Sequence, residues 1–202
     1  MIAVHWIDRS DHDQSESDWR ARRAASRALV ADTAGALGVD PVSVKRRARG
    51  KPVLSPPGLH YSMSHSGSLS ICAVADDHVG IDLELLDAPR TARLAGAIPL
   101  RFFTERERQA IAADPAALLR IFTGKEAWVK HQGVGLGAGL GGFDRESVRD
   151  LHPGIAFSDF DLPGAASTVC HTRGERPAPV RRHLTARQIA RGSELDRQER
   201  AL

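Results

Sequence analysis

Several residue types are scarce in this sequence of 202 residues, and each shortage excludes a class of protein. The two cysteines, Cys72 and Cys170, are too few for a disulfide framework or a structural zinc site. No stretch approaches the roughly 18 consecutive apolar residues that span a bilayer, so we expect no membrane span. The first residues lack the charged and apolar regions of a secretory signal, and we therefore expect a cytoplasmic protein.

Aromatic residues are also scarce, at 5% of the chain, and no recognised nucleic-acid motif is present. Both observations argue against a nucleic-acid-binding protein, although Arg-rich segments at 20–49 and 173–200 support that alternative weakly. Apolar residues make up 42% and charged residues 26%, which is ordinary for a globular protein with a core. The length fits one domain or two small halves.

Positive charge is missing from one stretch. Residues 52–87 carry five acidic residues and no Lys or Arg, whereas residues 20–51 carry nine Lys or Arg and two acids. A basic segment beside an acidic one suggests an anion held next to a metal cation. The simpler interpretation is an Arg-rich protein with solvated charged faces, and charge alone favours it.

Hydrophobic periodicity and local start and stop signals predict the main elements. They are a strand at 3–7, helices at 19–37, from 104 and at 114–131, strands at 69–75 and 79–86, and strand-like runs within 155–170. We expect the strands at 69–75 and 79–86 to form a hairpin. The segment after His171 is rich in Arg and has few large apolar residues, which is typical of a poorly ordered segment or a solvated helix.

Three carboxylates form the first candidate site. Asp82 and Glu84 share one face of a predicted strand, and Glu126 lies on a predicted helix. If they meet, a hard cation such as Mg²⁺ would relieve their repulsion. Taken alone, Asp82 and Glu84 fit a solvated strand face better. Lys130 follows Glu126 by four residues on the same helix face, so the two form either an exposed ion pair or a ridge that binds metal and phosphate.

Two further motifs are weaker. Residues 62–67, Ser-Met-Ser-His-Ser-Gly, offer hydroxyls and an imidazole to an anion. A catalytic pair of Ser64 and His65 is disfavoured, because adjacent residues rarely align hydroxyl and imidazole and no orienting acid is evident. Residues 137–142 match the dinucleotide pattern GxGxxG, but they follow a predicted helix rather than a strand, so we interpret them as a flexible loop.

Taken in order, these pieces resemble the 4'-phosphopantetheinyl transferase superfamily, in its longer, surfactin-type branch. The resemblance is good over residues 20–145, weaker over the first strand and 155–170, and ends near residue 172. The elements that carry it are Gly50–Leu54, Ser62–Gly67, Val79–Glu84, Arg101–Glu107, Phe122–Lys130 and Gly133–Leu136.

The resemblance implies an α+β fold of two similar α/β halves related by a pseudo-twofold, with the active site between them. The halves would be residues 1–88 and 89–172, followed by an Arg-rich tail, 173–202, that we expect to be poorly ordered. The implied reaction moves the phosphopantetheine arm of coenzyme A onto a serine of an apo acyl or peptidyl carrier protein and releases adenosine 3',5'-bisphosphate. Because one chain supplies both halves, a monomer is favoured.

The resemblance also implies roles for individual residues. Asp82, Glu84 and Glu126 would hold Mg²⁺, Lys130 would stabilise phosphate charge, and Glu126 would be the general base. The implied coenzyme A contacts are Arg22, Arg27, Lys51, Ser64, His65, Asp82, Glu126 and Lys130. A catalytically degenerate module that binds coenzyme A or a carrier protein is the main alternative, but the presence of all three carboxylates and Lys130 argues against it.

Overall fold

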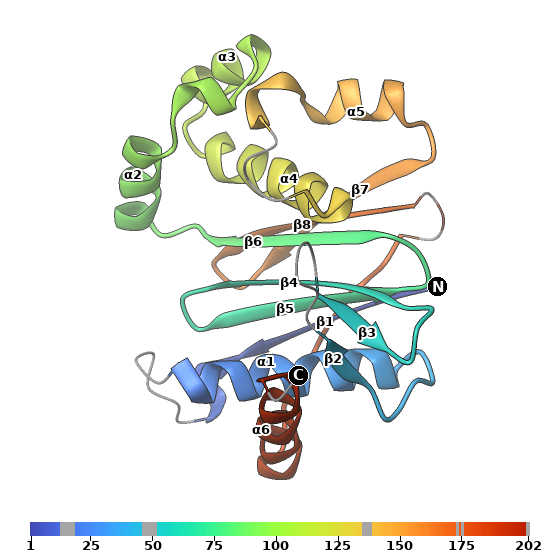
Figure 1. The fold of residues 1–202 in the computed structure, drawn as a ribbon. Coiled ribbons are helices and arrows are strands. Elements are labelled where there is room, and N and C mark those ends of the chain that lie inside the picture. The colour runs from blue at the N-terminus through green and yellow to red at the C-terminus, as the bar shows by residue number, and fades with distance from the viewer. Residues whose placement is uncertain (13–18, 46–51, 135–138, 173, 175, 201–202) are drawn as a thin grey trace.

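The computed structural model describes residues 1–12, 19–45, 52–134, 139–172, 174 and 176–200. Two β-sheets are stacked at its centre, and a long helix covers the outer face of each (Figure 1). The strands are β1 (Ile2–Asp8), β2 (Ser43–Lys45), β3 (Val53–Ser55), β4 (His60–Ser66), β5 (Leu69–Ala75), β6 (Val79–Leu85), β7 (Ile155–Leu162), β8 (Ala165–Thr172) and β9 (Pro179–Arg181). The α-helices are α1 (Trp19–Gly35), α2 (Ala88–Ala97), α3 (Glu105–Ala113), α4 (Ala117–Gln132), α5 (Arg145–Leu151) and α6 (Ala186–Arg200).

The α+β class is confirmed, but one predicted connection is wrong. The first sheet has the order β4-β5-β1-β9, the second has the order β6-β8-β7, and β2 pairs with β3 alone. Strands β5 and β6 therefore lie in different sheets and do not form the expected hairpin. The reason is that β5 pairs with β1 along one edge and with β4 along the other, which leaves no free edge for β6. Residues 76–78 instead lead the chain from one sheet to the other.

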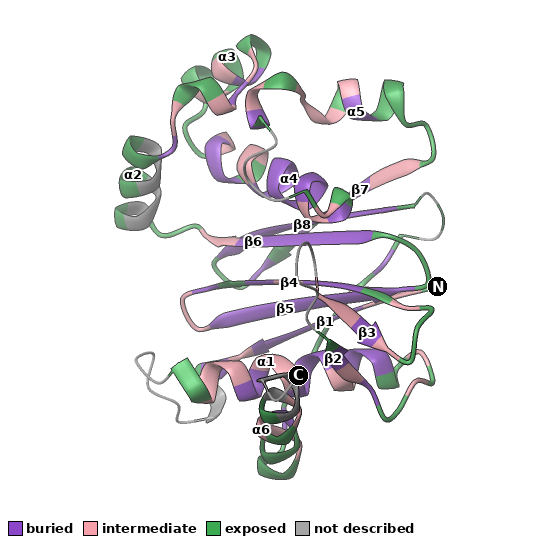
Figure 2. Ribbon diagram, in the orientation of Figure 1, coloured by how far each residue is buried: buried purple, intermediate pink, exposed green. Residues whose placement is uncertain are grey.

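The core follows the period-two alternation of the central strands. In β5, Leu69 and Ile71 face the second sheet, whereas Cys72 and Val74 face α1, and all four are buried. The sheets and the inner faces of α1 and α4 are buried, while α6 is largely exposed (Figure 2). Within the described residues, no helix is long and apolar enough to cross a membrane.

The C-terminal segment differs from the expected poorly ordered tail. Its described residues form β9, which pairs in parallel with β1, and α6, which packs across α1 (Figure 1). Close packing is possible because Gly192 has no side chain: a Cβ there would lie 2.1 Å from the Ala24 carbonyl oxygen. Leu184 is buried in the core cluster that includes the inner face of α1. The alternative of a solvated helix fits the largely exposed α6. A few well-placed residues, rather than overall apolar content, hold this segment.

A buried carboxylate completes the attachment of the C-terminal segment. Asp32 of α1 accepts hydrogen bonds from the Arg182 guanidinium at 2.8 and 3.0 Å and from the Gln188 amide at 3.2 Å. The His5 Nδ1 atom lies 2.8 Å from the same carboxylate. These donors hold the Asp32 pKa at about 2, although burial alone would raise it.

Candidate active site at the junction of the two sheets

Side-chain hydroxyls join the two sheets where strand β4 meets strand β6. The Ser62 hydroxyl accepts the Ile81 amide at 3.0 Å, and the Ser66 hydroxyl accepts the Leu85 amide at 3.1 Å. Ser62, Ser64 and Ser66 share one face of β4 because strand side chains alternate. The motif at 62–67 forms most of strand β4 and the turn after it, and its serines border the site.

Asp82 is the centre of this junction. Its Oδ1 atom accepts the Ser64 hydroxyl at 2.7 Å and the Lys130 ammonium at 2.6 Å, and Lys130 also lies 3.2 Å from the Ser64 hydroxyl. Its Oδ2 atom is buried without a hydrogen-bond partner in the described residues. The structure thus brings together a strand carboxylate and a helix lysine that are 48 positions apart in sequence.

A glycine lets the helix that carries Lys130 approach the strand that carries Asp82. A Cβ on Gly80 of β6 would lie 1.9 Å from the Ala127 carbonyl oxygen and 2.3 Å from the His131 amide nitrogen of α4. Real Cβ atoms do not come so close to backbone atoms, so α4 rests directly on β6 here. The glycine before Ile81 and Asp82 therefore sets the depth at which the helix side chains reach the strand.

Glu126 lies at the same junction, and one of its carboxylate oxygens lacks a hydrogen-bond partner in the described residues. Its residue is 7% exposed, and its Oε1 atom is buried without a hydrogen-bond partner in the described residues. Burial first, and then the negative charges of Asp82 and Glu84, raise the Glu126 pKa to about 7 against the opposing positive charge of Lys130. Glu84 accepts the Ser66 hydroxyl at 2.8 Å. The three carboxylates predicted to meet are therefore close enough to influence one another.

Two of these oxygens have the chemistry of metal ligands. Asp82 Oδ2 and Glu126 Oε1 are buried carboxylate oxygens without donors, and carboxylate oxygens are the ligands that Mg²⁺ prefers in proteins. No group of three or more His, Cys, Asp or Glu side chains in the described part of the chain is already arranged to hold a metal ion. The donor set thus fits a hard cation, while Lys130 occupies one oxygen of Asp82.

The expected coenzyme A contacts are only partly brought together. Ser64 and His65 lie on opposite faces of β4, so their side chains meet different neighbours: Ser64 meets Asp82, while His65 is exposed. Partial burial of the imidazole ring lowers the His65 pKa, and the positive charges of Arg9, Arg22 and Lys130 lower it further. Arg22 of α1 thus lies near His65.

Two expected contacts are not added to this group. Arg27 is half-buried on α1 and is not among the described cations that lower the His65 pKa. Lys51 lies outside the described residues.

Sequence reasoning missed one buried cation next to the site. Arg9 is 4% exposed, and its guanidinium donates to the Ser70 hydroxyl at 2.5 Å and to the Gly67 carbonyl. Gly67 has φ +56° and forms the turn between β4 and β5. Arg9 thus holds the turn that follows His65. No periodic pattern marks a single buried arginine, so nothing in the sequence indicated it.

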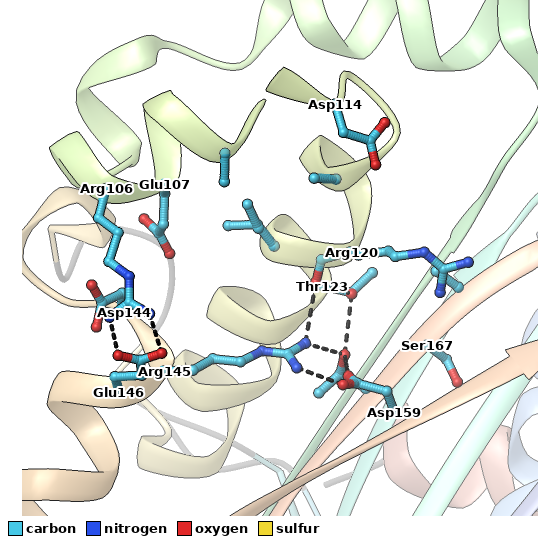
Figure 3. A pocket seen from close by; sticks show the side chains of 15 residues that line it. Arg106, Glu107, Asp114, Arg120, Thr123, Asp144, Arg145, Glu146, Asp159 and Ser167 are labelled. Atoms are coloured by element: carbon cyan, nitrogen blue, oxygen red, sulfur yellow. Dashed lines mark hydrogen bonds and ion pairs between the residues drawn. The ribbon is translucent and has the colours of Figure 1, made fainter. Parts of the chain in front are cut away.

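A separate cavity of about 340 Å³ lies between α3, α4, α5 and strands β7 and β8 (Figure 3). None of the expected site residues lines it. Two ion pairs form between its lining side chains: Arg145 with Asp159 at 2.7 Å, and Arg106 with Glu146. Arg145 Nε and Ser167 Oγ are buried there without a hydrogen-bond partner in the described residues. Its carboxylates are satisfied, unlike Asp82 and Glu126.

Comparisons with known proteins agree with the geometry. Residues 78–188 match the family model of the 4'-phosphopantetheinyl transferase superfamily, a match that covers both β6 and α4 and extends past residue 172 into α6. The chain is 30% identical to 4'-phosphopantetheinyl transferase psf-1 of Bacillus pumilus, over 66% of this chain and 58% of that protein.

Two further relatives carry the same name. The chain is 35% identical to 4'-phosphopantetheinyl transferase HetI of Nostoc sp., over 58% of this chain and 54% of that protein. It is 29% identical to 4'-phosphopantetheinyl transferase Sfp of Bacillus subtilis, over 56% of this chain and 51% of that protein. The chain thus spans little more than half the length of these curated relatives. It belongs to the 4'-phosphopantetheinyl transferase superfamily, in the surfactin-type branch.

Proposed function

We propose that this chain transfers the 4'-phosphopantetheine group of coenzyme A to a serine hydroxyl of an apo carrier protein and releases adenosine 3',5'-bisphosphate. The observation that carries the proposal is a pair of buried carboxylate oxygens, on Asp82 and Glu126, that have no hydrogen-bond partner within the described part of the chain and lie beside the Lys130 ammonium. Such a pair is costly in an empty fold, and it suits a site that binds a cation and a phosphate. The family match and the named relatives support the reaction class.

Asp82, Glu84 and Glu126 would hold Mg²⁺ in this proposal. When bound, the ion would neutralise the diphosphate of coenzyme A and orient its reacting phosphorus. Besides burial, repulsion from Asp82 and Glu84 raises the Glu126 pKa. A bound cation would relieve that repulsion.

Lys130 and Glu126 would act on the reacting groups. The carrier serine oxygen forms a bond to the phosphorus that carries the pantetheine arm, and the bond from that phosphorus to the bridging oxygen breaks. The electron pair stays on the departing adenosine 3',5'-bisphosphate, where the Lys130 ammonium would stabilise the developing charge. Glu126 would take the serine proton, directly or through water, because it is a carboxylate at this junction with a buried oxygen that has no hydrogen-bond partner in the described residues.

The remaining binding groups extend the proposal. His65 and Arg22 would hold the 3'-phosphate of coenzyme A, and Arg27 and Lys51 would add further positive charge. Ser64 would contact coenzyme A from the side of β4 that faces Asp82. We further propose that the two sheet-and-helix halves are related by a pseudo-twofold and that the protein works as a cytoplasmic monomer. A basic surface would suit the acidic surroundings of a carrier serine.

The test is to incubate the protein with coenzyme A, Mg²⁺ and a panel of apo carrier proteins, and then to measure intact mass. We expect one phosphopantetheine to be added to at least one carrier, and the addition to be lost with a chelator. Glu146→Gln, which replaces the acidic member of an exposed ion pair with an uncharged amide, is the matched control and should keep full transfer. Coenzyme A binding without transfer to any carrier would favour the degenerate binding module instead. Absence of coenzyme A binding would contradict both.

A further inference from the structure

The candidate catalytic side chains come from two elements whose relative placement must be fixed. Asp82 lies on β6, whereas Glu126 and Lys130 lie on α4. Gly80 allows α4 to rest on β6 at one end of their contact. Something must also hold the helix against the neighbouring strands β7 and β8.

One guanidinium bonds to all three elements on that side. Arg145, the first residue of α5, donates to the Asp159 carboxylate of β7 at 2.7 Å and to the Thr168 hydroxyl of β8 at 2.7 Å. It also donates to the Arg120 carbonyl of α4 at 3.2 Å (Figure 3). Thr168 in turn donates to Asp159 at 2.7 Å. Arg145 therefore ties the helix to both strands.

The guanidinium lies directly on the backbone of α4. A Cβ on Gly124 would be 2.1 Å from Arg145 Nε and 2.5 Å from Nη2, so only glycine leaves room for Arg145 there. Gly124 is two residues before Glu126 in the motif of residues 122–130. The glycine of that motif thus admits Arg145 rather than a ligand.

The same network reaches Asp82 across the sheet. In the β6–β8 pairing, Thr168 stands directly opposite Asp82, and its hydroxyl lies 3.2 Å from the Thr123 hydroxyl of α4. Thr168 is 1% exposed and Thr123 is fully buried. We propose that Arg145 is a positioning residue, which acts through Thr168 and the α4 backbone to fix Glu126 and Lys130 against Asp82.

This inference rests on the proposed transferase function. Arg145→Gln keeps a polar side chain but cannot serve three acceptors, so we expect kcat to fall about 10- to 100-fold, because small displacements of reacting groups are costly. The KM for coenzyme A should change less than twofold, since Arg145 lies away from His65 and Arg22. Gly124→Ala, which displaces the guanidinium, should give the same pattern.

Arg106→Gln is the matched control, because Arg106 lines the same cavity but pairs with exposed Glu146. Its kcat should stay within twofold of wild type. Thermal melting separates positioning from unfolding: the kcat loss should persist at temperatures where each variant is fully folded. Arg145→Lys, which can reach Asp159 alone, should recover stability more than kcat.

Two results would overturn the proposal: a kcat within twofold of wild type in folded Arg145→Gln, or an equal loss in Arg106→Gln. Amide hydrogen exchange over residues 117–132 gives a measurement without substrate. Faster exchange in Arg145→Gln but not in Arg106→Gln is expected. If wild type transfers nothing, the proposed function fails, while the exchange experiment still tests whether Arg145 holds α4.

Discussion

The two sides of α4 are both charged, but they differ in how those charges are satisfied. On the side of α3, α5 and β7, the carboxylates that line the cavity accept hydrogen bonds or ion pairs, such as Glu107 from Lys125 at 2.6 Å. On the side of β4 and β6, Asp82 and Glu126 each keep a buried oxygen that finds no donor among the residues that the structure describes. Paired charges fix the helix, whereas unpaired carboxylates remain available to a ligand.

This contrast has a practical consequence for locating function. The carboxylates that line the cavity of about 340 Å³ already accept hydrogen bonds or ion pairs, so they do not indicate a cation there. Two other lining atoms, Arg145 Nε and Ser167 Oγ, are buried without a hydrogen-bond partner in the described residues. The candidate chemistry lies instead in the junction of the two sheets. Removing a carboxylate should therefore cost activity on one side of α4 and stability on the other.

The largest expected effect is on the unpaired side. Glu126→Gln should lower transfer about 10³-fold, because it removes the proposed base and a metal ligand. The fold should remain intact, since the variant removes a buried negative charge next to two others. Mass measurement of carrier modification and circular dichroism check both parts. Transfer within tenfold of wild type would mean that Glu126 is not part of the reacting site.

The paired side should respond in the opposite way. Glu107→Gln keeps the capping hydrogen bond to the Thr104 amide but leaves the Lys125 ammonium, 1% exposed, without its counter-charge. Breaking a buried ion pair on one side costs about 3 kcal/mol or more. Denaturant unfolding should show this loss, whereas Glu146→Gln, which breaks an exposed pair, should cost less than about 1 kcal/mol. Equal stability of the two variants would contradict the comparison.

A variant of Lys130 tests whether its ammonium takes part in the reaction or only neutralises Asp82. Lys130→Ala should lower kcat about 10²-fold if its ammonium stabilises the departing phosphate. Kinetics with coenzyme A and one modified carrier separate the possibilities. An increase in the KM for coenzyme A at constant kcat would identify a binding group instead.

Local periodicity placed the candidate residues on their strand and helix faces better than it predicted the topology. Alternation placed Asp82 and Glu84 on one strand face, and helical spacing placed Glu126 with Lys130, because both periods are local. The meeting of the two elements came from resemblance alone, since no local pattern reports that Gly80 admits the Ala127 carbonyl.

Non-local pairing accounts for what was missed. The strands at 69–75 and 79–86 looked like a hairpin because they are adjacent in sequence, yet β5 already has two partners. The sequence left the C-terminal segment as either poorly ordered or a solvated helix, because its attachment depends on Asp32 and Gly192, which act singly. The resemblance implies that Ser64 and His65 both contact coenzyme A, although strand alternation places their side chains on opposite faces of β4.

The pH dependence of the free energy of unfolding gives a further test at Glu126. Its pKa in the fold, about 7, lies above the ordinary value of 4.5. The fold therefore favours the neutral carboxyl, so this contribution is complete below about pH 4.5 and is lost as pH rises through 7. After allowance for solvent screening, wild type should lose about 2 kcal/mol relative to Glu126→Gln between pH 5 and pH 8. Denaturant unfolding in a chelator at both pH values measures it; a constant difference would contradict an unpartnered Glu126.

A buried carboxylate with full partners should behave in the reverse sense, and Asp32 offers the smallest and last test. Its pKa of about 2 lies below the ordinary 3.8, because hydrogen bonds from His5 and Arg182 outweigh burial. This contribution is present above about pH 4 and is lost as pH falls through 2. Asp32→Asn should therefore cost about 1 to 2 kcal/mol at pH 7, after allowance for screening.

The measurement is denaturant unfolding at pH 7 and pH 3, with Asp40→Asn as the control, since Asp40 pairs with Arg191 at the surface. The cost of Asp32→Asn should shrink at pH 3, whereas Asp40→Asn should have little effect at either pH. Because Arg182 and Gln188 belong to the C-terminal segment, deletion of residues 173–202 should destabilise the protein by more than Asp32→Asn does. A deletion that leaves stability unchanged would show that β9 and α6 do not hold α1. The Asp32 carboxylate would then lack the donors that distinguish it from Glu126.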